Sequence, residues 1–139
     1  MGLDQAFDIS VSAIEANRLH LELIASNLAN VSTTRSITGG PYRRKIPIFS
    51  EKPLTFAEEL KRAMSGGVEV REVAEDLSPL QKIYNPGHPD ADRDGFVALP
   101  NVSLSKEMVD LVYVSKLYEA NVTVFNATKK MATDTLQLP

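Results

Sequence analysis

Hydrophobic residues recur at helical spacing over the first part of the chain. Residues 3–31 include neither proline nor glycine, and heptad positions can be assigned along them. One seam position holds Phe7, Ile14, Leu21 and Leu28, and the other holds Leu3, Ser10, Asn17, Ile24 and Val31. The pattern predicts an amphipathic helix about 40 Å long. We expect it to end near Asn30, because β-branched and hydroxyl side chains that compete for backbone hydrogen bonds follow there.

The last third of the chain repeats this pattern. Leu104, Leu111, Tyr118, Phe125 and Ala132 lie seven residues apart, and Met108, Ser115, Val122, Lys129 and Leu136 fill the alternate position. The regular alternation predicts a second long helix. Ser103 or Ser105 can cap its N-terminus, where Glu107 suits the positive end of the helix dipole. Residues 121–125 favour a strand by propensity, and we expect packing to override that preference.

The middle of the chain has a different composition. Seven of the eight prolines lie within residues 38–100, among short runs that are apolar or alternate with period two. These runs predict strands at 44–49, 68–73, 80–84 and 96–99, and a small helix at 55–64. The predicted fold class is therefore α+β, with two long terminal helices that pair as a coiled coil. We assign residues 1–35 and 102–139 to the helices, which form one core domain, and residues 36–101 to a small β-rich module.

Composition narrows the possible functions. The chain has 139 residues, a net charge of -3 and no long basic tract, so a nucleic acid partner is not expected. Cysteine is absent, which excludes thiol catalysis, disulfides and thiolate metal sites. No cleaved signal peptide or membrane span is recognisable. Neither a nucleophile in a sharp glycine-flanked turn nor a glycine-rich phosphate loop is visible, so we expect no enzymatic activity and no cofactor.

Polar residues within the two seams suggest that neighbouring molecules complete the packing. Four seam positions that would weaken a simple two-helix core hold Ser10, Asn17, Ser115 and Lys129. Further small or apolar residues outside the seams are Ala6, Ile9, Ala13, Ala16 and Leu23 in the first helix, and Val109, Val112 and Val124 in the last. The alternative is an antiparallel helical hairpin that is complete within a monomer.

Two terminal motifs resemble one protein family. Residues 25–34, with Asn27 and Asn30 flanking Leu28 and Ala29 before a hydroxyl run, resemble the signature of flagellar rod, hook and hook-associated axial proteins. Residues 107–111, 118–121, 126 and 130–131 are similar to the C-terminal helix of that family. In the centre, residues 39–44, 84–92, 95–97 and 100–102 are similar to its proximal rod members.

The resemblance implies a structural part of the basal-body rod that crosses the periplasm, exported through the flagellar type III apparatus without a cleaved signal. It would transmit motor torque. The implied partners are other copies of the chain, sister proximal rod proteins, the membrane-ring base and distal rod proteins. The expected assembly interface comprises Phe7, Ile14, Leu21, Ile24, Asn27, Leu28, Asn30, Leu104, Met108, Leu111, Tyr118, Val122 and Phe125.

Two alternatives belong to other functional classes. Asp90, Asp92, Asp94 and Gly95 are spaced like the opening of an EF-hand loop, which would make the chain a small calcium-responsive module. However, Asn101 occupies the twelfth position, where that loop requires a bidentate Glu, so an Asx-rich turn is the competing interpretation. The other alternative is a generic coiled-coil adaptor that forms dimers or trimers alone.

Three smaller features each allow two interpretations. Residues 42–45 form a basic cluster that could meet an acidic surface or lipid headgroups, or could protect an edge strand from aggregation. His20 and His88 are isolated, so we expect structural or surface roles and not zinc binding. Asn27 and Asn30 lie one turn apart and could cross-link helix ends or end the helix locally.

Overall fold

The computed structural model describes residues 2–51 and 66–137. Its elements are α1 (Gly2–Ala29), β1 (Lys45–Glu51), β2 (Val68–Glu75), β3 (Gln81–Tyr84), β4 (Phe96–Leu99) and α3 (Leu104–Leu136). Two long terminal helices with short strands between them confirm the predicted α+β class. The small helix predicted at 55–64 lies outside the described residues.

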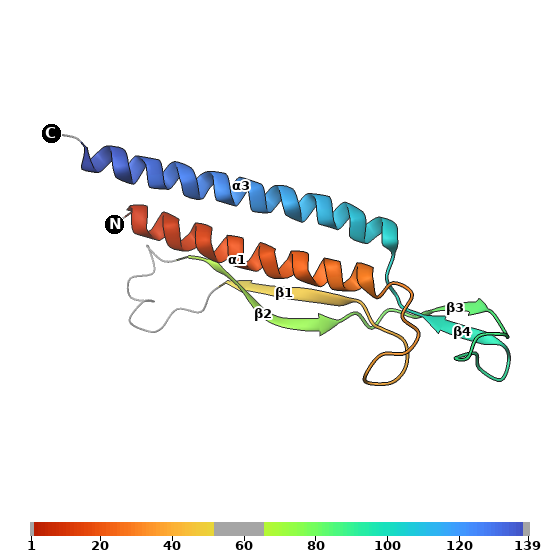
Figure 1. Cartoon of the computed structure of the whole chain (residues 1–139). Helices are drawn as coiled ribbons and strands as arrows, with labels where there is room; N and C mark the ends of the chain where they lie inside the picture. Colours follow the sequence, from red (N-terminus) through yellow and green to blue (C-terminus); the bar gives the residue numbers. More distant parts are fainter. Residues whose placement is uncertain (1, 52–65, 138–139) are drawn as a thin grey trace.

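The helix α1 is the central layer of the molecule. It runs antiparallel to α3 on one side and contacts the hairpin of β1 and β2 on the other (Figure 1). Among the described elements, α3 makes comparable contacts with α1 only. The hairpin of β3 and β4 projects beyond the end of the helical pair, opposite the two chain termini (Figure 1). The fold is therefore three layers deep where α1 is covered on both sides.

Each helix forms where the hydrophobic periodicity predicts it. At the terminal end of the pair, the rings of Phe7 and Phe125 pack edge to face, with centroids 5.2 Å apart. Ser10 is buried at the α1 seam, and its hydroxyl donates to the carbonyl of Ala6 at 2.7 Å, so its burial is satisfied within the helix. Residues 121–125 are helical, as expected when packing overrides β propensity.

One of the two predicted seam positions on α3 is only partly right, because Ser115 and Val122 are partly covered but Met108, Lys129 and Leu136 are exposed. The buried residues of this helix are Glu107, Val114 and Thr128, whereas Met108 is 55% exposed. Lys129 is also exposed. The other seam position is right from Leu111 onward, because Leu111, Tyr118, Phe125 and Ala132 are all partly covered, while Leu104 at its start is exposed. The error arose because polar side chains occupy much of the true position, so the hydrophobic pattern pointed to its neighbour.

The strands form two separate antiparallel pairs. In the first, Lys45 lies opposite Glu75 and Glu51 opposite Val68, with a register shift between Ile48 and Phe49. In the second, Tyr84 lies opposite Phe96, and their rings pack edge to face at 5.4 Å. All four predicted strands are therefore present. None of the described helices has the length and apolar character needed to cross a membrane.

Candidate assembly interface

A buried asparagine joins the end of α1 to β1 and α3. Asn27 is 1% exposed, and its Nδ2 donates to the carbonyl of Lys45 at 2.9 Å and to Oε2 of Glu107 at 3.1 Å. Its Oδ1 accepts from the Tyr42 hydroxyl and from the Lys45 amide, each at 2.9 Å. The amide group thus uses its two donors and both acceptor lone pairs. Asn27 therefore cross-links helix ends, which was one of its two predicted roles.

An ion pair completes this junction. Glu107 is fully buried in the first turn of α3, and Arg44 Nε lies 2.5 Å from its Oε1. Arg44 Nη2 also lies 3.3 Å from Oδ2 of Asp110. A buried carboxylate is costly unless it is paired and hydrogen-bonded, and Arg44 and Asn27 together meet that need. We call Asn27, Tyr42, Arg44, Glu107 and Asp110 the buried polar cluster.

A second asparagine supports the cluster from the loop before α3. Asn101 Oδ1 accepts from the backbone amide of Arg44 at 2.8 Å, and its Nδ2 donates to the carbonyl of Asp76 at 2.8 Å. No buried side-chain nitrogen or oxygen lacks a hydrogen-bond partner in the described part of the chain. The start of β1 is therefore held between both helices and the end of β2.

The basic segment 42–45 does not form a free basic surface, and its other predicted role, the protection of an edge strand, stays a prediction. Tyr42 is buried and Arg44 points into the cluster, so neither is available to an acidic partner surface or to lipid. Lys45 Nζ lies 5.9 Å from the centroid of the Tyr42 ring. The missed signal is a line of residues seven apart on α3, namely Glu107, Val114, Asn121 and Thr128, whose polar members require specific partners.

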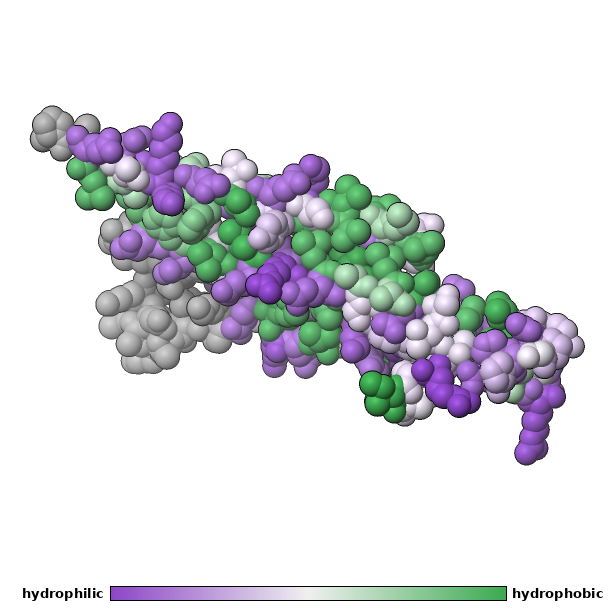
Figure 2. All heavy atoms as spheres, in the orientation of Figure 1, coloured by the Kyte–Doolittle hydropathy of each residue, from purple (hydrophilic) through white to green (hydrophobic). Residues whose placement is uncertain are grey.

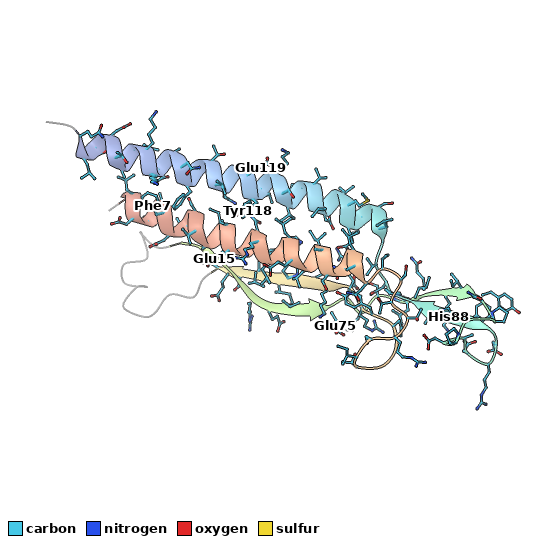
Figure 3. All side chains as sticks on the ribbon, in the orientation of Figure 1. Phe7, Glu15, Glu75, His88, Tyr118 and Glu119 are labelled. Atoms are coloured by element: carbon cyan, nitrogen blue, oxygen red, sulfur yellow. The ribbon has the colours of Figure 1, made fainter. Side chains whose placement is uncertain are left out.

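The predicted interface residues fall into two groups. On α1, Phe7, Ile14, Leu21 and Leu28 are partly covered, and Ile24 and Asn27 are buried. On α3, Leu111, Tyr118, Val122 and Phe125 are also partly covered, and Figure 3 shows Tyr118 directed toward α1 and Glu119 away from it. Asn30 donates to the carbonyl of Ser26 at 2.8 Å, which fits the predicted helix stop. The intramolecular helix pair covers this first group, and its contact with other molecules stays a prediction.

The second group lies on the surface of α3. Large apolar side chains there are strongly exposed: Leu104 by 53%, Met108 by 55%, Val109 by 68%, Val112 by 63% and Tyr113 by 63%. We call these five residues the outer apolar stripe. Figure 2 shows hydrophobic side chains gathered over this N-terminal half of α3. Contiguous exposed apolar surface on a small protein marks a site of interaction.

His20 has a local structural role. The ring of His20 packs edge to face on Phe49, with centroids 5.6 Å apart. Burial lowers the pKa of His20, while the nearby carboxylate of Asp110 acts in the opposite direction. No three acidic or histidine residues gather to hold a metal ion within residues 2–51 and 66–137.

The calcium-loop interpretation does not fit the geometry of residues 90–96. Asp90 accepts a hydrogen bond from the Thr34 hydroxyl at 2.8 Å and pairs with Arg35. The Thr34 hydrogen bond lowers the pKa of the Asp90 carboxyl. Asp92 Oδ1 accepts from the backbone amides of Asp94 and Phe96, at 3.0 and 2.8 Å. These contacts make an Asx turn that leads into β4.

Comparisons with known proteins agree over nearly the whole chain. The family model described as "Flagella basal body rod protein" matches residues 7–35, and that described as "Flagellar basal body rod FlgEFG protein C-terminal" matches residues 93–138. Similar relatives named flagellar basal-body rod protein FlgC occur in Borreliella burgdorferi, 41% identical over 94% of this chain and 93% of the relative, and in Bacillus subtilis, 42% identical over 96% and 95%. The relative in Escherichia coli O6:H1 is 40% identical over 99% and 98%.

Proposed function

This chain belongs to the FlgC family of flagellar basal-body rod proteins, and from that membership we propose that it builds the proximal part of the rod. It is a structural subunit of the bacterial flagellar basal body and so part of the motility apparatus. The observation that carries the proposal is a relationship of about 40% identity across nearly the full length of relatives that bear this name.

The chain assembles with other rod and basal-body components. We propose that these are other copies of itself, sister proximal rod proteins, the membrane-ring base and distal rod proteins. We further propose that the flagellar type III apparatus exports it. As a rod part it transmits torque. We also propose that the segments 1–35 and 102–139, which contain the paired helices α1 and α3, form its core domain. Interlocked, close-packed helices suit this load because many side chains share it.

We propose that the two groups of interface residues act in different ways. Leu21 and Leu111 are partly covered where α1 meets α3, and Asn27 fixes the junction, so they keep the two helices in register. Leu104 and Met108 are exposed and contact neighbouring subunits directly. The outer apolar stripe supports a direct contact with other subunits. Apolar surface left in water costs about 25 cal/mol per Å², and a neighbouring subunit that covers the stripe removes this cost.

The chain works without catalysis or a cofactor in this proposal. The charged groups of the buried polar cluster are engaged in ion pairs and hydrogen bonds that hold three elements together. Such groups stabilise a packing arrangement and present no carboxylate to a substrate. An assay of the purified chain for hydrolase activity should therefore give only background rates.

The test uses cells from which the chromosomal copy of the gene has been deleted. A plasmid-borne wild-type chain should restore swimming and appear in purified basal bodies. A Val109→Asp and Val112→Asp double variant should be produced at normal levels but be missing from them. The matched control is the double variant Ile37→Asp and Leu77→Asp, because both side chains are fully or mostly exposed outside the two helices and the pair adds the same two charges. Normal incorporation of the double variant would exclude the outer apolar stripe from the interface.

A further inference from the structure

The exposed surface of α3 has two apolar sides, which differ in the size of their side chains. Each residue turns an α-helix by about 100°, so residues spaced by three or four positions lie on one side. Tyr118 marks the side of α3 that faces α1 (Figure 3). Among the described elements α3 contacts only α1, so no other described element covers the two apolar sides.

Large side chains form the first of these sides. Leu104, Met108 and Val112 follow one another at intervals of four residues, and they are exposed by 53%, 55% and 63%. Side chains at this spacing form a ridge along the surface of a helix. We call these three residues the α3 ridge. It occupies the first turns of α3, which begins at Leu104.

Large and small side chains alternate along the second side. Its six residues are spaced by four and three positions in turn, none of them is charged, and all are exposed: Tyr113, Leu117, Ala120, Val124, Ala127 and Met131. This is the spacing with which a helix packs against a partner helix. The two alanines leave space between their larger neighbours. We call these six residues the mixed face of α3, which is about 27 Å long.

The α3 ridge and the mixed face point in different directions. From the rotation per residue, their centres lie about 140° apart around the helix, and each lies about 110° from the side that packs on α1. One molecule cannot bring the two surfaces together, because both belong to the same helix. A second copy can, because every copy presents both surfaces.

We propose that the α3 ridge of one copy packs into the mixed face of α3 on a second copy, with the two helices parallel. This inference rests on the proposed role as a rod subunit. The large side chains of the ridge fill the spaces beside Ala120 and Ala127, which gives the close packing found between helices. The contact joins two different surfaces, so it continues from copy to copy as a ring or a filament and does not end at a dimer.

The lengths of the two surfaces determine the register of the contact. Met108 is the centre of the ridge, and the centre of the mixed face lies between Ala120 and Val124. Placing Met108 beside Ala120 shifts the second copy along the helix axis by the distance between positions 108 and 120, about 18 Å. Val112 then lies level with Val124 and next to Ala127. All three ridge side chains therefore fall within the length of the mixed face.

One contact of this size is weak by itself. Stable protein complexes bury roughly 1,200–2,000 Å² in total, and three ridge side chains on a single helix cover less than that. The free chain should therefore be mainly monomeric in dilute solution. In a rod each copy makes the contact twice, once with its ridge and once with its mixed face, so the repeated contacts reinforce one another.

Disulfide trapping in purified basal bodies tests the contact. The chain has no cysteine, so Met108→Cys and Ala120→Cys in the same chain supply its only two thiols. These thiols lie about 18 Å apart along one helix, which is too far for a disulfide within a molecule. In the proposed register they are adjacent between copies, so mild oxidation should link successive copies into dimers, trimers and longer species. Electrophoresis under non-reducing conditions measures these species.

The matched control carries Met108→Cys together with Asn126→Cys. Asn126 is exposed like Ala120, but it lies on the same side of α3 as the ridge. The control should give several-fold less of the linked species. Equal amounts from the two variants would reflect random collision and overturn the contact. A lack of linked species in basal bodies that contain the Met108→Cys and Ala120→Cys variant would overturn it as well.

An exchange of side-chain sizes tests the packing without thiols. Ala120→Met fills the space that receives the ridge and should lower the amount of the chain in basal bodies several-fold. Adding Met108→Ala shortens the ridge at the same point and should restore most of that amount. Both residues favour helix, and circular dichroism of the purified variants checks that helix content is unchanged. Normal incorporation of Ala120→Met, or a double variant no better than Ala120→Met, would overturn the contact.

The result in cells separates this inference from the proposed function. If the wild-type chain enters basal bodies and the Ala120→Met variant does so equally well, the rod role stands and the contact between copies fails. If the wild-type chain does not enter basal bodies, the proposed function itself fails, whatever the oxidation result.

Discussion

The side-chain amide of Asn27 donates a hydrogen bond of 3.1 Å to the carboxylate of Glu107, across a separation of 80 residues in the sequence. This bond joins the end of the first helix to the first turn of the last. Both side chains are buried, and both also bond to the start of β1, through Lys45 and Arg44. The relative positions of three elements therefore depend on a few polar atoms.

Asn27→Ala should lower the free energy of unfolding by about 1–3 kcal/mol. The substitution leaves the Lys45 amide and the Tyr42 hydroxyl without their acceptor in a dry environment. Urea denaturation followed by circular dichroism measures the change. Asn126→Ala, at an exposed position of α3, is the control and should be nearly neutral. Equal stability of the two variants would show that the Asn27 hydrogen bonds are replaced by water.

Arg44→Met should destabilise the chain by about 3–5 kcal/mol, because it leaves the Glu107 carboxylate buried without its cation. Adding Glu107→Leu should recover a large part of this loss, since the double variant buries no unpaired charge. Chemical denaturation of both single variants and the double variant gives the coupling free energy. Additive effects would mean that the two side chains do not interact as described.

Stability should fall as pH decreases below about 6.5, the pKa of an unperturbed histidine. Burial lowers the pKa of His20 in the folded state, so in this window the unfolded chain binds more protons than the folded chain. The loss should level off once pH passes the lowered folded pKa. His20→Phe should reduce the slope of unfolding free energy between about pH 7.5 and 5.5. His88→Gln should keep it, and an unchanged slope in His20→Phe would assign the effect to another group.

Gly95→Ala should disrupt the β3–β4 hairpin while the helices remain folded. Gly95 has φ of +83°, and an added Cβ would stand 2.9 Å from Cε2 of Tyr84. We expect a local cost of about 1–3 kcal/mol. Hydrogen exchange should rise in residues 81–84 and 96–99 only. Gly87→Ala, whose nearest neighbour would be 3.9 Å away, should leave exchange unchanged.

Leu21→Asp or Leu111→Asp should abolish assembly into basal bodies. Both side chains are partly covered where α1 and α3 pair, and a carboxylate there separates the helices. The β3–β4 hairpin, which has no comparable contact with either helix, should stay folded. Quantification in purified basal bodies tests this, with Leu77→Asp as the control of equal charge. Normal incorporation of either variant would contradict a role for the helix pair.

The sequence predicted the elements well because periodicity reflects which sides of a helix or strand are covered. Phe7, Leu111 and Phe125 were placed correctly, since apolar side chains seven apart must face the same neighbour. The side of α3 that faces α1 was predicted only in part, because one of the two seam positions includes exposed residues. It depends on Glu107, whose burial is compensated by Arg44 and Asn27 from two distant segments.

The buried polar cluster could not be predicted for the same reason. Asn27 was singled out by its motif, but its partners come from β1 and from α3, and spacing along the chain does not reveal such long-range bonds. Arg44 was grouped with its neighbours as surface charge, because the sequence does not show that its side chain points inward. Only the packing of the folded chain shows this. Sequence patterns report local burial, whereas ion pairs between distant segments depend on the folded arrangement.

The order of the three layers, with α1 between α3 and the β1–β2 hairpin, determines how a mechanical force on α3 is transmitted through the molecule. Among the described elements α3 contacts α1 and no strand. An axial pull on α3 can therefore reach the β1–β2 hairpin by way of α1, through the ion pair of Arg44 with Glu107, or along the chain through the hydrogen bonds of Asn101. The two helices would slide past each other under shear if nothing pinned one end. The contacts of Asn27 and Arg44 hold one end of the α1–α3 pair in place. We therefore expect the two helices to separate first at the opposite end, where the chain termini lie (Figure 1).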